Sequence, residues 1–389
     1  TSPDTMVSQI KRGVLDLIGG ARAGIADPFL PEKIRQGRSD EIRECIGCNI
    51  CIASWHDGVP VRCTQNATAG EEWRRGWHPE RFSKTKEAQS VLVVGGGPAG
   101  LEAALIAAKQ GFDVTLSERT DDWGGRVLQE SRLPGLATWR RVRDYRVAAL
   151  SQMGNVSMFL ESELDGDGIE AFGADHIAIA TGARWTNYLY STLEIPVGRL
   201  EGDRVYTPHD VFANQISGDR VLVFDFDHYY LGGLVAEHLG AEGFKVIYAT
   251  PSGHASPWTF MTNELPYVYQ ALAKQKVEIL TTQTLEAFDG TRATLANLFH
   301  REPIERDVDA VVIVGHREPN DDLYQALLNL PTSASTLSLV GDAHAPGSIA
   351  HAVYSGHAFA RALIEDNSAL YLRDEPMNSV TPASVFARG

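Results

Sequence analysis

The chain has 389 residues, of which 43% are hydrophobic and 22% charged, so it is long enough for two or three domains. Its formal net charge of −15 disfavours nucleic acid as a partner, because that would require a basic surface. No apolar run reaches the length of a membrane span and the first residues lack the regions of a signal peptide, which together predict a cytoplasmic protein.

The four cysteines come first in chain order and follow the pattern C-x2-C-x2-C-x11-C. They are Cys45, Cys48, Cys51 and Cys63. Three cysteines at steps of three residues, closed by a fourth, are typical of a [4Fe–4S] cluster, which carries single electrons. A structural zinc site would more commonly use two separated C-x2-C pairs, and a disulfide is less consistent with three cysteines in one short run. We therefore predict that all four are cluster ligands.

A dinucleotide-binding fingerprint follows the cysteines. Residues 90–94 form a short β-branched run, the segment 95–100 reads GGGPAG, residues 101–110 have a helical composition, and residues 113–117 predict a second strand. The glycines have distinct physical roles: the first permits a tight turn, the second lets the backbone approach a pyrophosphate, and the third lets helix and strand pack closely. These three are Gly95, Gly97 and Gly100.

An acidic residue stands where the second strand ends. Glu118 can accept hydrogen bonds from the ribose hydroxyls of an adenosine, and its charge would repel a 2′-phosphate. Arg119 follows it and is counted among the candidate nucleotide ligands. The strand, the glycine loop, the helix and the acid together predict an adenine-nucleotide site at the helix N-terminus.

Three later motifs extend this layout. A Gly-Gly-Arg sequence contains Gly125, an Ala-Thr-Gly sequence contains Thr181, and a late Val-Gly-Asp sequence ends in Asp342. Each alone would be an ordinary turn. Their order and spacing resemble those of flavoprotein reductases with two dinucleotide domains, so all three residues are candidate cofactor contacts.

The reductase layout predicts a second nucleotide-binding unit inserted in the first. Its elements are expected as a strand over 220–224, a helix over 231–239 and a strand over 245–248. The loop that should carry phosphate-binding glycines instead reads DFDHYY over 225–230. Carboxylates would repel a pyrophosphate and bulky side chains would block it, so we predict a fold without its NAD(P)H. The competing interpretation is a metal site formed by Asp225, Asp227 and His228.

Taken together, these motifs resemble the C-terminal portion of the trimethylamine, dimethylamine and histamine dehydrogenases. The likeness is dense over 45–51, 63–72, 74–80 and 180–185. It implies an enzyme in which flavin mononucleotide (FMN) oxidises a small amine and passes single electrons through the cluster to an electron-transfer flavoprotein. It further implies an ADP without a redox role, where reductase relatives hold FAD, and a homodimer. The tail looks shorter than in the trimethylamine enzymes, which favours histamine over a methylated amine.

The same resemblance explains the first forty residues. The stretch 15–28 resembles the end of a flavin-binding (β/α)8 barrel, where the last strand leads to a loop that holds the flavin phosphate. Gly20 and Arg22 carry over to that role, although Arg22 alone would also suit an exposed surface. Most of a barrel of about 250 residues would precede residue 1, so the amine-binding and catalytic residues are expected outside this sequence.

The sequence thus predicts an α/β architecture made of four parts. These are a barrel remnant over 1–40, a cluster segment over 41–85, an ADP-binding domain over 86–205 and 330–389, and an inserted Rossmann-like domain over 206–329. The preferred function is amine dehydrogenation. One alternative is an NAD(P)H-dependent enoate or 2,4-dienoyl-CoA reductase containing FAD, and another is an electron-transfer subunit that binds a separate flavin barrel.

Overall fold

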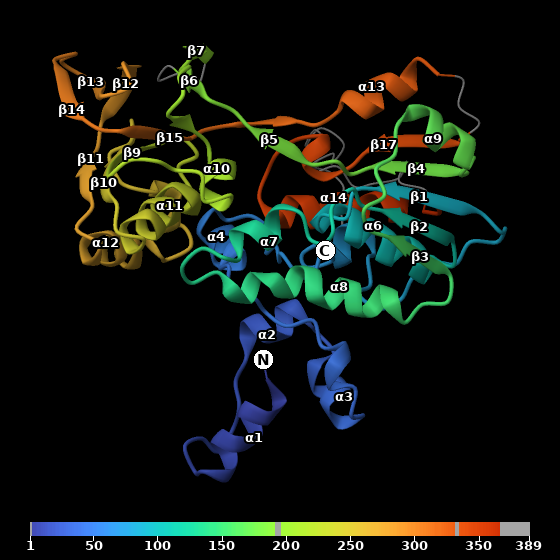
Figure 1. Ribbon diagram of the computed structural model, residues 1–389. Helices are drawn as coiled ribbons and strands as arrows, with labels where there is room; N and C mark the ends of the chain where they lie inside the picture. Colours follow the sequence, from blue (N-terminus) through green and yellow to red (C-terminus); the bar gives the residue numbers. More distant parts are fainter. Residues whose placement is uncertain (1, 191–195, 331–333, 366–389) are drawn as a thin grey trace, which may run out of the picture.

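The computed structural model describes residues 2–190, 196–330 and 334–365, which form two α/β lobes beside each other and an N-terminal segment that projects from them (Figure 1). Each lobe is built on a parallel five-stranded sheet. Residues 366–389, which the sequence assigns to the ADP-binding domain, lie outside the described ranges.

The first lobe has the strand order β17-β4-β1-β2-β3. Its strands are β1 (Ser90–Val94), β2 (Asp113–Ser117), β3 (Val156–Phe159), β4 (His176–Ile179) and β17 (Thr336–Leu339). Its helices are α6 (Pro98–Gln110), α7 (Arg126–Glu130), α8 (Arg141–Ser151), α9 (Gly166–Phe172), α13 (Asp322–Leu328) and α14 (Ile349–Ala362). The strands and the helix of the fingerprint are confirmed, and β1 and β2 have the expected bounds.

The second lobe has the strand order β11-β10-β9-β15-β8. Its strands are β8 (Val205–Tyr206), β9 (Arg220–Asp225), β10 (Lys245–Ala249), β11 (Glu278–Leu280) and β15 (Ala310–Val314). An antiparallel sheet joins β12 (Gln283–Phe288), β13 (Arg292–Asn297) and β14 (Pro303–Asp307). The helices are α10 (Pro208–Phe212), α11 (Tyr230–Ala241) and α12 (Leu265–Lys274). The β9–α11–β10 unit confirms the predicted second nucleotide-binding fold.

The second lobe is an insertion in the first, because β17 pairs with β4 and completes the first sheet after the chain returns. Two antiparallel strands, β5 (Ala183–Trp185) and β16 (Arg317–Pro319), carry the chain out and back. The remaining short elements are β6 (Tyr188–Tyr190), β7 (Pro196–Arg199), η1 (Ser39–Glu41), η2 (Ala137–Arg140), η3 (Pro257–Phe260) and η4 (Gly341–Ala343). The two lobes therefore meet where these crossing strands leave the first sheet.

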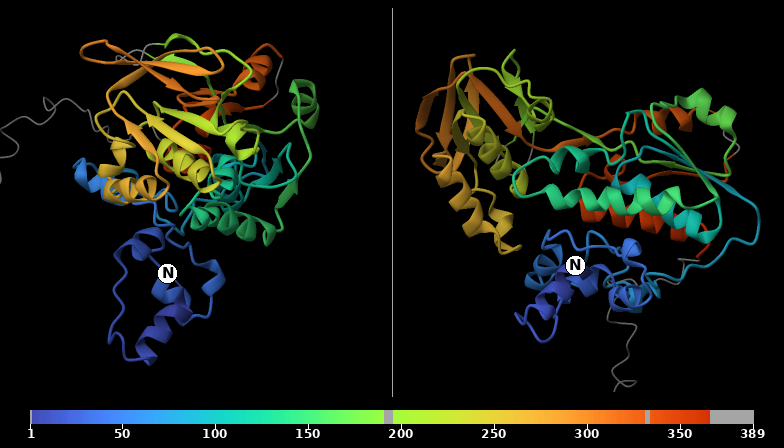
Figure 2. Two further views of the ribbon diagram at one scale, coloured as in Figure 1. Left: turned by 60° about the vertical axis from the view of Figure 1, so that its left-hand side comes forward. Right: turned by 60° about the horizontal axis from the view of Figure 1, so that its bottom comes forward.

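The N-terminal segment contains three helices and, in its described part, no strand. They are α1 (Pro3–Lys11), α2 (Ala21–Ala26) and α3 (Leu30–Arg35), and α4 (Ile50–His56) and α5 (Glu72–Arg75) follow in the cluster segment. The barrel strand expected before Gly19 does not form, and Leu17 is 85% exposed. A barrel strand requires hydrogen-bonded neighbours, and no described segment pairs with this one. Figure 2 shows that α1 and the loop after it extend away from both lobes.

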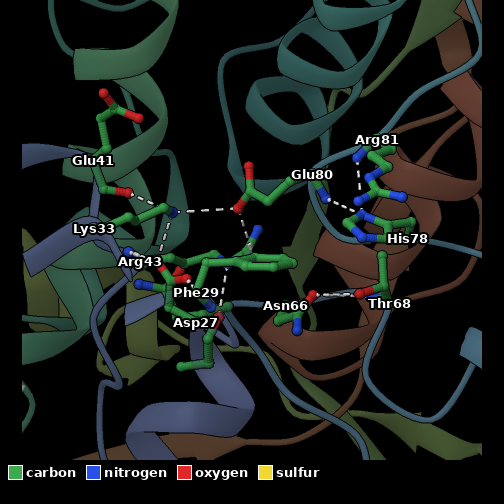
Figure 3. Close-up of polar contacts among 12 residues, drawn as sticks. Asp27, Phe29, Lys33, Glu41, Arg43, Asn66, Thr68, His78, Glu80 and Arg81 are labelled. Atoms are coloured by element: carbon green, nitrogen blue, oxygen red, sulfur yellow. Dashed lines mark hydrogen bonds and ion pairs between the residues drawn. The ribbon is translucent and has the colours of Figure 1, made fainter. Parts of the chain in front are cut away.

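A buried ionic cluster anchors this segment to the rest of the chain (Figure 3). Asp27, which is fully buried, accepts a hydrogen bond from Lys33 Nζ at 2.7 Å and one from the Arg43 amide at 2.9 Å. Lys33 Nζ also donates to the Glu41 carbonyl at 3.0 Å and to Glu80 Oε1 at 3.3 Å. Because buried charges are stable only when they are paired and hydrogen-bonded, this cluster fixes α2 and α3 next to the cysteine-bearing loops.

None of the helices in the described ranges combines the length and the apolar character required to cross a membrane.

Candidate functional site

All four cysteines line one small cavity. Its other lining residues are Arg22, Ile25, Ile46, Asn49, Thr64 and Gln65. The cysteines are free and partly buried, and they come from two loops and from the first turn of α4. The structure therefore brings together the four side chains that the spacing predicted as cluster ligands.

The local backbone explains how three cysteines so close in sequence face the same cavity. Gly47 and Asn49 both have left-handed conformations, with φ of +73° and +56°, so the chain reverses its direction on either side of Cys48. The Asn49 side chain donates to the Thr262 carbonyl at 3.0 Å, which attaches this turn to the second lobe.

The partial burial of the cysteines affects the ionisation of their thiols. Burial raises the pKa of Cys48 to about 12, and burial also raises the pKa of Cys51 and Cys63. Backbone amides of Gln65 and Asn66 oppose this shift at Cys63. Thiols in such a site become thiolates when a cationic centre compensates for the lost solvation, as metal ions do for their ligands.

The shared cavity is compatible with a cubane. Within the described ranges, no group of three or more His, Cys, Asp or Glu side chains is placed to hold one metal ion, and this includes Asp225, Asp227 and His228. A zinc ion needs its thiolates at about 2.3 Å, whereas in a cubane each thiolate binds its own iron. Four thiols that line one shared cavity therefore fit the predicted cluster.

The glycine loop of the first lobe has the geometry that a nucleotide requires. Gly95 has φ of +109°, and a Cβ there would lie 2.4 Å from the Ala180 carbonyl oxygen. A Cβ at Gly100 would lie 1.9 Å from the Gly95 carbonyl oxygen, so only glycine lets α6 approach β1 this closely. Gly97 differs, since a Cβ there would meet nothing within 4 Å. The space in front of Gly97 is thus open, at the N-terminus of the 13-residue α6, where phosphates bind.

Glu118 lies beside this loop and is held by it. Its Oε2 accepts a hydrogen bond from the Gly96 amide at 2.7 Å, and its Oε1 accepts bonds from the Thr120 amide and hydroxyl, both at 2.9 Å. The carboxylate is therefore fixed at the end of β2, where the ribose of a bound nucleotide would lie. The neighbouring Arg119 is exposed.

The three candidate cofactor contacts from the later motifs, Gly125, Thr181 and Asp342, lie in different surroundings. A Cβ at Gly125 would lie 3.3 Å from Gly97 Cα, so the Gly-Gly-Arg turn lies directly against the phosphate loop. The Thr181 hydroxyl donates to the Asn320 carbonyl at 2.5 Å, where the chain returns from the second lobe. The Asp342 carboxylate accepts bonds from Arg317 Nη1 at 2.5 Å and from the Gly347 amide at 3.0 Å.

Two arginines that the sequence analysis did not select surround Asp342. Arg126 and Arg317 both form ion pairs with Asp342, and both donate to the Gly347 carbonyl, at 2.8 and 2.6 Å. Arg126 had a usable signal, because it directly follows the glycine pair. Arg317 had none, since it is a single arginine in a short strand whose partner residues lie far away in the sequence.

In the second lobe, the loop over 225–230 corresponds to the glycine loop of the first. Its backbone amides donate hydrogen bonds to acceptors within the chain itself. Asp225 is fully buried, and its Oδ1 accepts bonds from the Asp227 and His228 amides at 3.1 and 3.2 Å. The Phe226 amide donates to the Val314 carbonyl at 2.8 Å. Burial raises the pKa of Asp225 to about 6, although the hydrogen bonds from Tyr248 and the loop amides lower it. The expectation that Asp225 would face and repel a pyrophosphate is therefore wrong in detail: its carboxylate points inward and takes the place of an external anion.

The surroundings of this loop also lack the groups that bind a dinucleotide. Thr250 follows β10, at the position that Glu118 has after β2 in the first lobe. A cavity borders the loop, and its lining contains no lysine or arginine; the lining residues are Phe226, His228, Pro251, Ser252, Pro257, Trp258, Met261 and Leu298. Both the ribose acid and a cation for the phosphates are thus missing from the described lining.

Substituting Gly97 with alanine separates nucleotide binding from folding. The variant is expected to keep its midpoint of thermal unfolding, because Gly97 has an ordinary φ of −74° and free space for a methyl group. It should lose bound nucleotide, since that methyl group occupies the space of the phosphates. Gly100→Ala is the contrasting control and should cost about 1–3 kcal/mol of stability through overpacking. Full nucleotide content in a folded Gly97→Ala protein would refute this site.

Comparison with known proteins agrees with these features. Residues 93–162 match the family model of an NAD(P)-binding Rossmann-like domain. The chain is 35% identical to dimethylamine dehydrogenase of Hyphomicrobium sp. (strain x) over 398 residues, covering 94% of this chain and 54% of that protein. Histamine dehydrogenase from Rhizobium sp. 4-9 superimposes with a TM-score of 0.90 at 41% identity, covering 94% of this chain and 57% of that one.

A third relative is the 6-hydroxypseudooxynicotine amine oxidase from Pseudomonas geniculata N1, with a TM-score of 0.91 and 41% identity, covering 94% of this chain and 55% of that one. The chain thus spans about half the length of each of these relatives. Because the likeness extends over nearly all of the chain and includes the whole arrangement of two lobes, the chain belongs to the amine dehydrogenase family that contains the dimethylamine and histamine dehydrogenases.

Proposed function

We propose that this chain is the electron-transfer and nucleotide-binding part of an amine dehydrogenase that oxidises histamine or a methylated amine. The observation that carries the proposal is the cavity shared by Cys45, Cys48, Cys51 and Cys63. A [4Fe–4S] cluster held there would accept and release single electrons. We propose that the cluster passes these electrons to an electron-transfer flavoprotein, which is a separate protein.

The position of Arg22 supports an FMN next to the cluster. Its Nη1 donates to Asn49 Oδ1 at 2.5 Å, and its side chain lines the cysteine cavity. Gly20 precedes α2 as its N-cap, and its residue is exposed, so the backbone there is open to a phosphate. If Gly20 and Arg22 hold the flavin phosphate, the flavin lies close to the thiol cavity, which is the condition for rapid electron transfer between them.

The first lobe would hold ADP. Gly97 faces open space at the start of α6, and Glu118 is fixed where an adenosine ribose belongs. The nucleotide would have a structural role, because α6 is the central helix between the two other helices α8 and α14. FAD at the same site is the prediction of the reductase alternative.

The second lobe is expected to bind neither NADH nor NADPH. The Asp225 carboxylate accepts hydrogen bonds from the amides of Asp227 and His228, so these amides are not free to bind a phosphate. The described lining of the adjacent cavity contains no lysine or arginine to pair with phosphates. Rapid anaerobic mixing with either nucleotide should leave the flavin absorbance unchanged, while dithionite bleaches it in the same preparation. Bleaching by NADH or NADPH within seconds would favour the reductase alternative.

A steady-state assay of the full natural polypeptide against a panel of amines tests the function directly. Histamine, dimethylamine and trimethylamine should be compared, with electron-transfer flavoprotein and an artificial dye as alternative acceptors. Turnover with at least one amine is expected. Turnover with NADPH and an enoate, and with none of the amines, would overturn the proposal. A natural polypeptide no longer than this chain on a denaturing gel would instead support a separate electron-transfer subunit.

A further inference from the structure

A cavity of about 470 Å³ lies beside the loop over 225–230 in the second lobe. Its lining comes from the segments that follow β9, β10 and β13, and from η3 with the residue after it. In open parallel α/β sheets, ligands bind outside the carboxyl ends of the strands, and ligand pockets commonly measure about 300–1,000 Å³. The position and the size of this cavity therefore correspond to those of a ligand site.

The chemistry of the lining favours an uncharged ligand. Six of the eight lining residues are apolar or aromatic, and none is an aspartate, glutamate, lysine or arginine. A charged group placed against such a lining would lose hydration without gaining a partner of opposite charge. The two polar residues, His228 and Ser252, can supply the few hydrogen bonds that orient a ligand in an apolar pocket.

Two aromatic rings of the lining are held in place by neighbouring rings. Phe226 packs edge-to-face on His316, with ring centroids 5.5 Å apart, and Trp258 packs in the same way on Tyr229, with centroids 4.5 Å apart. The Trp258 amide also donates to the His228 carbonyl at 2.9 Å. Rings that are already fixed can contact a planar ligand with little loss of side-chain freedom. The lining therefore favours an aromatic ligand over a flexible aliphatic one.

One wall of the cavity is formed by residues 256–264, here called the wall segment. It supplies three of the lining residues, which are Pro257, Trp258 and Met261. Its first residue is fixed from behind, because the Ser256 amide donates to the Tyr248 hydroxyl at 2.9 Å and the Ser256 hydroxyl accepts from the Gly233 amide at 3.1 Å. The start of the wall segment is thus attached to the core of the second lobe.

The other end of the wall segment contacts the turn that carries the cysteines. The Thr262 carbonyl accepts from Asn49 Nδ2 at 3.0 Å, and Asn263 Oδ1 lies 3.2 Å from His56 Nε2. Asn49 directly follows Cys48 and has the left-handed conformation on which that turn depends. A ligand that restrains the wall segment therefore also restrains the backbone next to Cys48, since binding to the ordered state stabilises that state.

We infer that this cavity is an effector site for an uncharged aromatic molecule of one or two rings, and that its occupancy stabilises the cysteine-bearing turn. The site lies where an active nucleotide-binding domain would hold its dinucleotide, but its lining selects a different chemistry. The choice of ligand is independent of the proposed function. The effect on the turn rests on the proposed cluster.

Equilibrium dialysis of the full natural polypeptide against radiolabelled indole tests the site. Indole has two fused rings and no charge, and indole-3-acetate adds a negative charge to the same rings. The cavity should bind indole with a dissociation constant below about 1 mM, and indole-3-acetate at least about 10-fold more weakly. Equal affinity for the two compounds would overturn the assignment of an uncharged ligand.

Two aromatic residues of η3 provide a matched pair of variants. Trp258 lines the cavity and is 37% exposed, so Trp258→Ala should fold and should lose the indole bound there, while Trp258→Phe should keep part of it. Phe260 is 63% exposed and is not a lining residue, so Phe260→Ala should bind indole as the unmodified protein does. Indole bound at an amine site would be common to all variants, so the difference between them reports on the cavity.

Equal indole binding by the unmodified protein and by folded Trp258→Ala would overturn the site. If Trp258→Ala does not fold, Leu298→Trp gives the same readout, because it places a larger side chain at a half-buried position of the lining and fills the cavity. Indole binding should then be lost through exclusion rather than through the loss of a contact.

The rate of iron release to EDTA under anaerobic conditions tests the effect on the turn. Saturating indole should slow this release at least about 3-fold in the unmodified protein and should have no effect in Trp258→Ala. An unchanged rate in a protein that binds indole would overturn the effector role. A preparation that contains no iron would instead contradict the proposed cluster, and the dialysis result would still decide whether the cavity binds its ligand.

Discussion

Replacing Arg146 with alanine is expected to lower the free energy of unfolding by about 3–5 kcal/mol, because it leaves a buried carboxylate without its partner. Arg146 is fully buried, and its Nε donates to Glu102 Oε2 at 2.7 Å. Burial opposes the ionisation of Glu102, yet Arg146 and His357 together lower its pKa to about 2. The charge on Glu102 thus depends on Arg146, and the alanine variant loses that compensation.

The same arginine connects the nucleotide helix to the cysteine cavity. Glu102 lies on α6, and Arg146 Nη1 donates to Gln65 Oε1 at 2.9 Å. Gln65 lines the cavity and stands two residues after Cys63. We therefore expect the Arg146→Ala protein to lose cluster absorbance faster than the unmodified protein, in addition to its lower unfolding midpoint in denaturant.

Arg141→Ala on the same helix is the matched control. Arg141 pairs with Glu44 at 3.0 Å, but both side chains are about one third exposed, so its loss should cost less than about 1 kcal/mol. Equal effects of the two substitutions would contradict the role given to the buried network. Urea titrations followed by circular dichroism measure both values under the same conditions.

Replacing Cys48 with serine is expected to abolish the cluster. Iron and acid-labile sulfide should fall from about four of each per chain to near zero, because three thiolates leave one iron without its protein ligand. Cys48 is partly buried, and its Sγ lies 3.1 Å from the Thr64 hydroxyl. Reduction of the flavin by an amine should persist, while onward transfer to a protein acceptor should stop.

Trp55→Phe provides the control for this variant. Trp55 lies on the same helix α4, is 71% exposed and does not line the cavity. Its loss should leave the iron and sulfide content unchanged. Stoichiometric zinc without sulfide in the unmodified protein would show that the cysteines form a different site.

The sequence predicted features that depend on local pattern. The strands β1 and β2 have their expected bounds because the glycine loop separates them and each has its pairing neighbours within this chain. The four cysteines meet as predicted, since Gly47 and Asn49 set the turns between them locally. Glu118 likewise lies where the end of a strand must place it.

Features that depend on distant partners could not be predicted in this way. The inward orientation of Asp225 requires Tyr248 on β10, and the contact between Arg317 and Asp342 requires two segments that meet only in the folded chain. The absent strand before Gly19 has the same cause, because a barrel strand forms only beside its neighbours. The local sequence pattern was enough to predict the helices and strands. The orientation of the side chains at their ends depends on contacts with distant parts of the chain.

The most direct test of the central claim is electron paramagnetic resonance of the full natural polypeptide, frozen shortly after anaerobic mixing with an amine. The account predicts that histamine or a methylated amine produces the signal of a reduced [4Fe–4S] cluster, and that NADH and NADPH leave the sample silent. A signal that appears with NADH or NADPH and with none of the amines would contradict it.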